Sequence, residues 1–409
     1  MLKCSIAMLN RLKTTKSCDW KVNRIYVDYA ATTPLDPRVF EEMKPYFSTN
    51  YGNAESINTF GLDARQAVEQ SRVTLSKFMN ADPFEVIFTG SATEANNMVL
   101  KGHAFKEGKQ KTSIAVSAIE HSCVLNAAAW LQDQGYKVTY IPVDEEGLVD
   151  MSILEDVLRK GVTLVSIIHG NNEIGVIQPI SEIGKMCHRY GSYFQTDAAQ
   201  TFGKIPTDVK SMNVDMMTVN AHKMYGPKGV GALYINKDMK LTPLLHGGSH
   251  EFGLRAGTHN VPGIVGFAKA VELRRDEMRG EAVKLTGLRD KLIKGALEIS
   301  GTNLNGHSQK RLPSNVNLRF LYIEGESLVL NLDLEGISAS SASACSSRDE
   351  TASYVLLALG VDPVEAKGSL RISLGKHNTE DEINYILEAL PRVVNKLRQL
   401  SPLTPRSSN

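Results

Sequence analysis

Lys223 has the clearest capacity for covalent chemistry in this chain, because of what surrounds it. It follows the apolar, strand-like segment 215–219 and precedes a turn rich in glycine and proline, 226–229. In α/β folds, functional side chains gather where buried strands end. A lone lysine is usually a solvated surface residue, but its amine can also form a Schiff base with an aldehyde, and pyridoxal phosphate is the common biological aldehyde held in this way. The rest of the chain favours the second interpretation.

A candidate phosphate site is the run Thr89-Gly90-Ser91-Ala92-Thr93-Glu94, where a predicted strand ends and a predicted helix begins. The free backbone N–H groups of a helix start attract an anion, and the Thr93 hydroxyl adds a donor. Small residues in this position are more often a simple helix cap, so the motif alone is a weak signal. His222, next to the lysine, is a candidate second contact to the phosphate.

Asp197 is the candidate acid for a pyridine nitrogen. It follows the strand-like run 192–196, so it too is expected at the carboxyl end of a strand. A carboxylate there keeps a pyridine ring protonated, which makes the ring an electron sink. The alternative is an aspartate that only caps a helix. Gln200, on the same segment, is a candidate hydrogen-bond partner for the ring oxygen.

Three further polar residues have side chains suited to such a site. His121 can stack on a pyridine ring and move protons, although a single histidine at a strand end is more often a surface residue. Asn172, which also follows a predicted strand, can hydrogen-bond the ring oxygen or a substrate. Arg371 offers a planar fork for a substrate carboxylate.

Cys345 is the candidate nucleophilic thiol. It belongs to a loop near 338–350 whose residues up to 347 are small and polar, with little to pack. A structural cysteine such as Cys187 has large apolar neighbours instead. A thiol on such a loop is suited to travel toward a substrate; the alternative is a chance cysteine on a surface loop. Cys123 is the rival thiol, but it lies in a predicted helix that limits its movement.

The elements that must position these residues follow an α/β pattern. From residue 85 onward, short apolar runs alternate with helical stretches, and most runs are apolar on both faces, as in a buried parallel sheet. A charged helical stretch that begins near 265 leads into a second, smaller unit. We therefore expect a large domain, 34–277, with a mostly parallel seven-stranded sheet. A smaller α+β domain is expected to combine 21–33 with 278–409.

Composition limits the functional classes. The chain has 409 residues, enough for two domains, and its 46 Lys and Arg against 45 Asp and Glu leave a net charge of +1. This near-neutral net charge gives no positive electrostatic field that would attract nucleic acid. No apolar run is long enough to span a membrane. The five cysteines show no zinc-like spacing, and their sparse, odd number favours a reducing compartment.

Residues 1–20 differ from the rest of the chain. Four basic side chains precede the first acid, Asp19, and hydroxyl side chains are frequent. Leu2, Ile6 and Leu9 would share one face of a helix. This pattern resembles a mitochondrial presequence; the alternative is a basic tail without a targeting role.

Six motifs, in order along the chain, resemble those of the cysteine desulfurases, which are pyridoxal-phosphate enzymes of fold type I in the class V aminotransferase group. They are Tyr26-Val27-Asp28-Tyr29-Ala30-Ala31-Thr32-Thr33-Pro34, Asn171-Asn172-Glu173-Ile174-Gly175-Val176, His222-Lys223-Met224-Tyr225-Gly226-Pro227-Lys228-Gly229, Arg255-Ala256-Gly257-Thr258, Ser343-Ala344-Cys345-Ser346 and Arg371-Ile372-Ser373-Leu374-Gly375. The resemblance extends over nearly the whole chain. The long loop around Cys345 is similar to that of the subgroup that supplies iron–sulfur cluster assembly.

The resemblance implies roles for the candidates. Lys223 would hold pyridoxal phosphate, and Thr258 would reach the phosphate bound in the partner subunit of a homodimer. The other residues implied around the cofactor and substrate are Ala92, Thr93, His121, Asn172, Asp197, Gln200, Asn220, His222 and Arg371. Lys223 would remove the α-proton of L-cysteine, and His121 would assist proton transfer. Cys345 would take the sulfur as a persulfide while alanine leaves.

The destination of the sulfur is also implied by the resemblance. Cys345 would pass it to a scaffold protein for iron–sulfur cluster assembly, with tRNA thiolation as a second use. In some relatives the matching cysteine also ligates a cluster in transit, so Cys345 is an expected transient iron–sulfur ligand. Eukaryotic relatives work in mitochondria or derived organelles, which fits the presequence-like segment; a cytoplasmic location in a bacterium is the alternative.

Several positions depart from the family pattern. Asn58 stands where a histidine is usual, Gly90-Ser91 reverses the usual order, and Asn220 replaces a phosphate-binding Ser or Thr, which predicts weaker cofactor binding. Ala342 replaces a common glycine and predicts a stiffer thiol loop. Two alternatives therefore stay open: a selenocysteine lyase or related lyase, and a non-catalytic dimeric paralogue. The Cys345 loop favours desulfuration.

Overall fold

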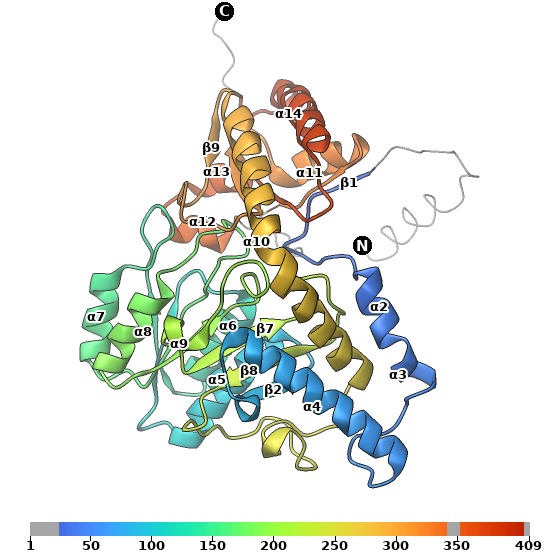
Figure 1. Ribbon diagram of the computed structural model, residues 1–409. Helices are drawn as coiled ribbons and strands as arrows, with labels where there is room; N and C mark the ends of the chain where they lie inside the picture. Colours follow the sequence, from blue (N-terminus) through green and yellow to red (C-terminus); the bar gives the residue numbers. More distant parts are fainter. Residues whose placement is uncertain (1–23, 342–351, 405–409) are drawn as a thin grey trace, which may run out of the picture.

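The largest element of the computed structural model, which describes residues 24–341 and 352–404, is a seven-stranded sheet (Figure 1). Its strands are β2 (Val86–Thr89), β3 (Ser113–Ser117), β4 (Lys137–Ile141), β5 (Leu164–Ser166), β6 (Tyr193–Asp197), β7 (Met216–Asn220) and β8 (Gly231–Ile235), in the spatial order β2-β8-β7-β6-β5-β3-β4. Of these strands, β8 runs antiparallel to both neighbours, whereas the pairings among β3 to β7 are parallel. The predicted mostly parallel seven-stranded sheet is confirmed.

Helices cover both faces of this sheet. They are α2 (Pro37–Met43), α3 (Pro45–Ser48), α4 (Thr59–Met79), α5 (Ala92–Glu107), α6 (Ser122–Asp133), α7 (Met151–Arg159), α8 (Ile180–Arg189) and α9 (Val209–Met212), with the 3₁₀ turns η1 (Pro83–Glu85) and η2 (Glu251–Gly253). Successive residues of a strand point to opposite faces: Ile114 packs with α5 and α6, while Ala115 packs with α4, α7 and α8. The sheet is therefore buried between two apolar layers.

A second, smaller core surrounds an antiparallel sheet in the order β12-β10-β9. This region contains β9 (Thr302–Leu304), β10 (Asn315–Phe320), α11 (Gly325–Leu334), α12 (Tyr354–Ala358), α13 (Pro363–Lys367), β12 (Ser369–Ser373) and α14 (Glu380–Leu400). The N-terminal strand β1 (Ile25–Tyr26) pairs with β11 (Ile337–Ser338), and Ile25 and Val27 pack in this second core. The start of the described chain therefore lies beside its C-terminal part.

One long helix, α10 (Val261–Leu297), connects the two cores (Figure 1). Phe267 and Val271 pack in the core of the large sheet, whereas Leu285 and Leu292 pack in the smaller core. The predicted division at 277/278 falls inside this helix, between the two groups, and stays a prediction. The small sheet and the large sheet are thus held in a fixed relation by a continuous backbone.

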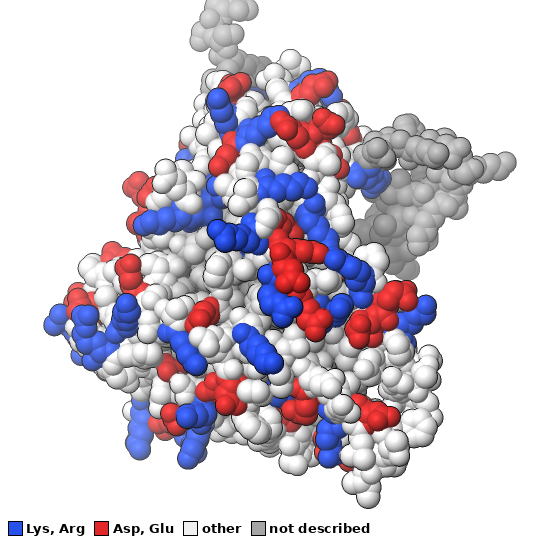
Figure 2. Space-filling model, viewed as in Figure 1, with Lys and Arg blue, Asp and Glu red and all other residues white. Residues whose placement is uncertain are grey.

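The surface carries charges of both signs, mixed over the face seen in Figure 2, with no area dominated by one sign. Among residues 24–341 and 352–404, no helix combines the length and the apolar character needed to cross a bilayer. The presequence-like segment 1–20, Ala342 and Cys345 lie outside the described residues.

Candidate active site

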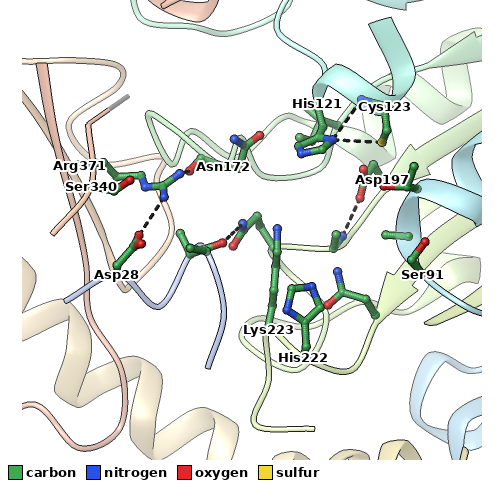
Figure 3. A pocket seen from close by; sticks show the side chains of 18 residues that line it. Asp28, Ser91, His121, Cys123, Asn172, Asp197, His222, Lys223, Ser340 and Arg371 are labelled. Carbon is green, nitrogen blue, oxygen red and sulfur yellow. Dashed lines mark hydrogen bonds and ion pairs between the residues drawn. The ribbon is translucent and has the colours of Figure 1, made fainter. Parts of the chain in front are cut away.

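A single cavity of about 370 Å³ brings most of the predicted site residues together (Figure 3). It opens at the carboxyl ends of β5, β6 and β7, on the side of the small sheet. Ten predicted residues line it: Ala92, Thr93, His121, Asn172, Asp197, Gln200, Asn220, His222, Lys223 and Arg371. Thr258 is not part of this lining, because it is exposed on the loop before α10. Cys345 lies outside the described residues, so its distance from the cavity stays untested.

Lys223 enters the cavity from a tight turn directly after β7 (Figure 3). Backbone N–H groups of Met224 and Gly226 both donate to the carbonyl of Ala221, at 3.1 and 3.0 Å. Tyr225 has a φ of 66°, a conformation that side chains disfavour, and its N–H donates to Thr33 Oγ1 at 2.8 Å. The N-terminal segment of the chain therefore helps to hold the turn that presents the lysine.

Asp197, the last residue of β6, is held by two N–H donors. Asn96 Nδ2 donates to its Oδ2 at 2.7 Å, and the Ala199 N–H donates to its Oδ1 at 2.8 Å. Asn96 accepts in turn from Gln195 Nε2 at 2.9 Å, which fixes its amide orientation. Asn96 was not predicted, although its spacing from Thr93 puts both residues on one face of α5. The carboxylate is thus fixed at the strand end with charge-assisted hydrogen bonds.

His121 caps the start of α6 with its ring. Its Nδ1 accepts the backbone N–H of Cys123 at 3.2 Å, so the neutral ring carries its proton on Nε2. Burial and the charge of Lys223 lower the pKa of His121, against an opposing effect of Asp197. The imidazole is therefore neutral near pH 7, and its Nε2–H is the proton it can offer.

The thiol of Cys123 lines the same cavity (Figure 3). Its Sγ lies 3.1 Å from His121 Nδ1 and 3.3 Å from Asn96 Nδ2. Burial and the charge of Asp197 raise the pKa of this thiol to about 12. Because the thiolate is the reactive form, Cys123 is a poor nucleophile at neutral pH despite its place in the cavity.

The positive end of α5 also faces the cavity. Ser91 caps the helix by accepting the N–H of Glu94 at 3.1 Å, and Ser91, Ala92 and Thr93 all line the cavity. Glu94 accepts from the Gly90 N–H at 2.9 Å and from Arg255 Nε at 2.8 Å. The turn before the helix is thereby fixed, and its free N–H groups form an anion-binding position.

Arg371, on β12, forms the opposite wall of the cavity (Figure 3). Its Nη1 donates to the Asn172 carbonyl at 3.0 Å, and its Nη2 donates to Asp28 Oδ1 at 2.9 Å. Burial raises the pKa of Asp28, although the arginine opposes this effect. The guanidinium is buried and held in one orientation, which suits the recognition of a carboxylate.

Comparisons with known proteins give the family. The family model described as aminotransferase class-V matches residues 25–386. The chain belongs to this family. Within it, a protein named cysteine desulfurase IscS from Dictyoglomus turgidum is 49% identical over 380 residues, which cover 92% of this chain and 96% of that protein. The mitochondrial cysteine desulfurase of Saccharomyces cerevisiae is 46% identical over 382 residues, which cover 93% of this chain and 76% of the yeast protein.

A solved structure described as a NifS-like protein supports the same assignment. It superposes with a TM-score of 0.86 at 38% identity and covers 91% of this chain and 100% of its own. The chain is thus a class V aminotransferase of the cysteine desulfurase group, with fold type I as predicted, and pyridoxal phosphate is the cofactor of this group.

The cavity of this class V aminotransferase fits pyridoxal phosphate. Asn172 Oδ1 and Asn220 Oδ1 are buried and have no hydrogen-bond partner within 24–341 and 352–404. Leaving a buried polar atom unpaired costs about 1–3 kcal/mol, so amides of this kind at a cavity wall are suited to a polar ligand. Burial and the charge of Lys223 lower the pKa of His222 to about 4, so it is a neutral hydrogen-bonding ring. The cavity thus has an amine for the cofactor's aldehyde, an acid for its ring nitrogen and a helix start for its phosphate. Neutral polar groups are suited to its ring oxygen.

Two departures from the family pattern have local structural roles. Asn58 caps α4 by accepting the N–H of Gly61 at 3.0 Å, and Ser91 caps α5. Asn58 does not belong to the lining of the cavity. Asn220 does belong to it, so its predicted effect on cofactor affinity stays a prediction.

Proposed function

We propose that this protein is a pyridoxal-phosphate-dependent cysteine desulfurase that removes sulfur from L-cysteine, releases L-alanine and supplies iron–sulfur cluster assembly. One observation carries the proposal: Lys223, Asp197 and His121 line one cavity in a chain 49% identical to a protein named cysteine desulfurase. These are the amine, the acid and the proton carrier that the reaction requires.

Pyridoxal phosphate, when bound, supplies an aldehyde for a lysine amine and a pyridinium ring that withdraws electrons from the substrate's α-carbon. Asp197 keeps a proton on the ring nitrogen, and Asn96 keeps Asp197 aimed at that position. The start of α5, with Thr93, binds the phosphate. Lys223 removes the α-proton of the substrate once its amine is free.

His121 and Arg371 act on the substrate from opposite sides of the cavity. Because Nδ1 of His121 is engaged by the start of α6, the ring works through Nε2–H as a proton donor. Arg371 binds the substrate carboxylate; its Nε is buried and has no partner within the described ranges. Asn172 helps to place the substrate, since its carbonyl holds Arg371 and its amide faces the cavity.

Cys345 is the proposed sulfur acceptor. Its thiolate attacks the substrate sulfur, the carbon–sulfur bond breaks, and the carbon takes a proton, so that cysteine and a thiol become alanine and a persulfide. The high pKa of the Cys123 thiol supports Cys345 as the acceptor, because Cys123 is protonated near pH 7. The persulfide then passes to a scaffold protein for cluster assembly.

The active unit is proposed to be a homodimer in which Thr258 completes the phosphate site of the partner. Its exposure, and its absence from the cavity within its own chain, support this role. Mixing Lys223→Ala chains with Thr258→Ala chains tests it. A mixed dimer has one intact site, so we expect full-affinity cofactor binding at half of the sites of the mixed dimers, which is about a quarter of all sites after random exchange of chains, whereas either variant alone has none. Failure of the mixture to recover affinity contradicts a shared site.

The reaction itself is tested with the purified holoenzyme. Wild type is expected to show the visible band of a lysine-bound cofactor and to convert L-cysteine into alanine, with sulfide released in the presence of a reductant. Cys345→Ser should keep the band and lose both products. Lys223→Ala should lose the band. Cys187→Ala is the matched thiol control, because Cys187 lies in the core and does not line the cavity.

The proposal is wrong if wild type forms no such band, or if it forms the band but yields no alanine from L-cysteine. Equal product formation by wild type and Cys345→Ser would reject the persulfide step alone. A mitochondrial location is proposed from the presequence-like segment 1–20 and from the similarity to the yeast protein. Recovery from cells of a protein that still begins at Met1 would contradict the presequence.

A further inference from the structure

Lys204 is a half-buried lysine whose amine the proposed reaction does not use. Its Nζ donates to Gln200 Oε1 at 3.2 Å. Within residues 24–341 and 352–404 this amine forms no ion pair. The nearby carboxylate of Glu281 is taken by Arg274 Nη1 at 2.6 Å and by the Tyr225 hydroxyl at 3.1 Å. Lys204 therefore directs its donor at Gln200 instead of at a counter-ion.

The surroundings of this amine are costly for a charge. Burial, followed by the charge of Lys223, lowers the pKa of Lys204 to about 7, with Glu281 opposing. A largely desolvated amine without a carboxylate partner adds nothing to the stability of a fold, so its position beside a cavity favours a functional role. An uncharged amine still donates a hydrogen bond, and the contact with Gln200 therefore holds in both protonation states.

Gln200 lines the cavity, and its two neighbours specify the same orientation of its amide. Oε1 accepts from Lys204, while Nε2 donates to the Ala30 carbonyl at 2.9 Å. If the amide were flipped, Nε2 would face the Lys204 amine, so that two donors met, and Oε1 would face the Ala30 carbonyl, so that two acceptors met. Ala30 is itself fixed, since its N–H donates to Ser373 Oγ at 2.8 Å. The second hydrogen on Nε2 is left for a group inside the cavity.

We propose that Lys204 is a positioning residue that keeps the N–H₂ end of Gln200 directed at an acceptor oxygen of the bound cofactor. The inference rests on the proposed function, because it takes pyridoxal phosphate as the occupant of the cavity. Lys204 itself does not line the cavity. It acts through Gln200, and an amide free to flip would present Oε1 to the ring oxygen and repel it.

A double-mutant cycle tests this assignment. Apoprotein is prepared for wild type, Lys204→Met, Gln200→Ala and the double variant, and each is titrated with pyridoxal phosphate while the visible band is recorded. Loss of one directed hydrogen bond predicts an affinity about tenfold weaker for each single variant. If Lys204 acts through Gln200, the double variant binds within about twofold of Gln200→Ala. Lys210→Met, a change of an exposed lysine on α9, is the matched control.

Two further measurements separate positioning from folding. The melting temperature of each apoprotein reports any general loss of structure, and Lys204→Met should melt no lower than wild type because it removes a poorly solvated charge. Lys204→Arg keeps a donor and should bind pyridoxal phosphate more tightly than Lys204→Met. Affinity of Lys204→Met within twofold of wild type, or losses that multiply in the double variant, would overturn the inference. Wild type that binds no pyridoxal phosphate would instead overturn the proposed function.

Discussion

Replacing Glu251 with glutamine will destabilise the protein far more than replacing Glu69, although both carboxylates contact Arg72. The two oxygens of Glu251 accept from Arg72 Nη1 and Nη2, each at 2.8 Å. Glu251 also accepts from the Phe88 N–H and from His259 Nε2, each at 2.7 Å. The Glu69 side chain is 52% exposed, against 1% for that of Glu251. The two substitutions therefore differ mainly in the burial of the carboxylate that contacts Arg72.

The pKa of Glu251 sets the size of the effect. Burial alone would raise it, but the hydrogen bonds from Arg72 and His259 outweigh burial and lower the pKa from 4.5 to about 2. A difference of this size between the folded and unfolded chain stabilises the fold by about 3 kcal/mol at neutral pH. Because the folded pKa is the lower one, this contribution is complete above pH 4.5 and is lost as the pH falls toward 2.

Urea unfolding of wild type, Glu251→Gln and Glu69→Gln provides the measurement. At pH 7 we expect a loss of about 3 kcal/mol in unfolding free energy for Glu251→Gln and less than about 1 kcal/mol for Glu69→Gln. The gap between wild type and Glu251→Gln should narrow as the pH is lowered from about 5 to about 3. Equal losses in the two variants, or a gap that does not narrow, would refute the reasoning.

The same substitution should also affect the loop that leads to Thr258. Glu251 has a φ of 49° and Phe252 a φ of 56°, a left-handed conformation that costs energy for residues with a side chain. The buried ion pair holds this turn in place, so its loss should loosen the exposed segment that follows. We therefore expect weaker binding of pyridoxal phosphate in Glu251→Gln than in Glu69→Gln if Thr258 completes the partner's site.

Three other substitutions have definite expected outcomes. Asn96→Ala removes a donor from Asp197 and should slow alanine formation about tenfold, measured with the visible band as a check on cofactor loading. Cys123→Ala should retain alanine formation within about threefold of wild type, because the backbone N–H that holds the neighbouring imidazole remains. Burial raises the pKa of the Glu173 carboxyl from 4.5 to about 7, against the opposing hydrogen bond from Ser353. Glu173→Gln resembles the protonated form of this carboxyl at every pH. Because the pKa is higher in the folded chain, the wild-type carboxyl stabilises the fold below pH 4.5, and this stabilisation is lost as the pH rises through 7. The melting temperature of Glu173→Gln should therefore rise relative to that of wild type between about pH 5 and pH 8.

The positions of the strands along the chain, and therefore the strand ends, could be predicted from the sequence because they depend on local apolar runs. Lys223, Asp197 and Asn172 follow neighbouring strands of one parallel sheet, and the carboxyl ends of such strands meet at one edge. Their convergence in the cavity follows from that rule. The start of α10 was expected later than it occurs, although Asn260, which caps it by accepting the Gly263 N–H at 3.1 Å, was a readable signal.

The opposite wall of the cavity could not be predicted in the same way. Arg371 belongs to the small sheet, and its distance from Asp197 depends on how two cores pack along α10. No local pattern carries that information, and the family motif around Arg371 supplied it instead. Asn96 was missed for a related reason, because its partner Asp197 is about a hundred residues away in sequence. Lys204 is only four residues from Gln200, but its role depends on the Ala30 carbonyl that orients the same amide from a distant segment.

The effect of each departure from the family pattern depends on where the residue lies in the structure. Asn58 and Ser91 differ from the usual residues, yet each caps a helix through a side-chain oxygen, a role that several small polar residues share. Asn220 instead places a buried amide oxygen in the cavity wall, with no partner in the described part of the chain. A phosphate oxygen can be met by the N–H₂ end of such an amide once the amide rotates. Asn220 is therefore a departure that should change cofactor affinity, whereas the Asn58 cap, which lies outside the lining of the cavity, should leave it unchanged.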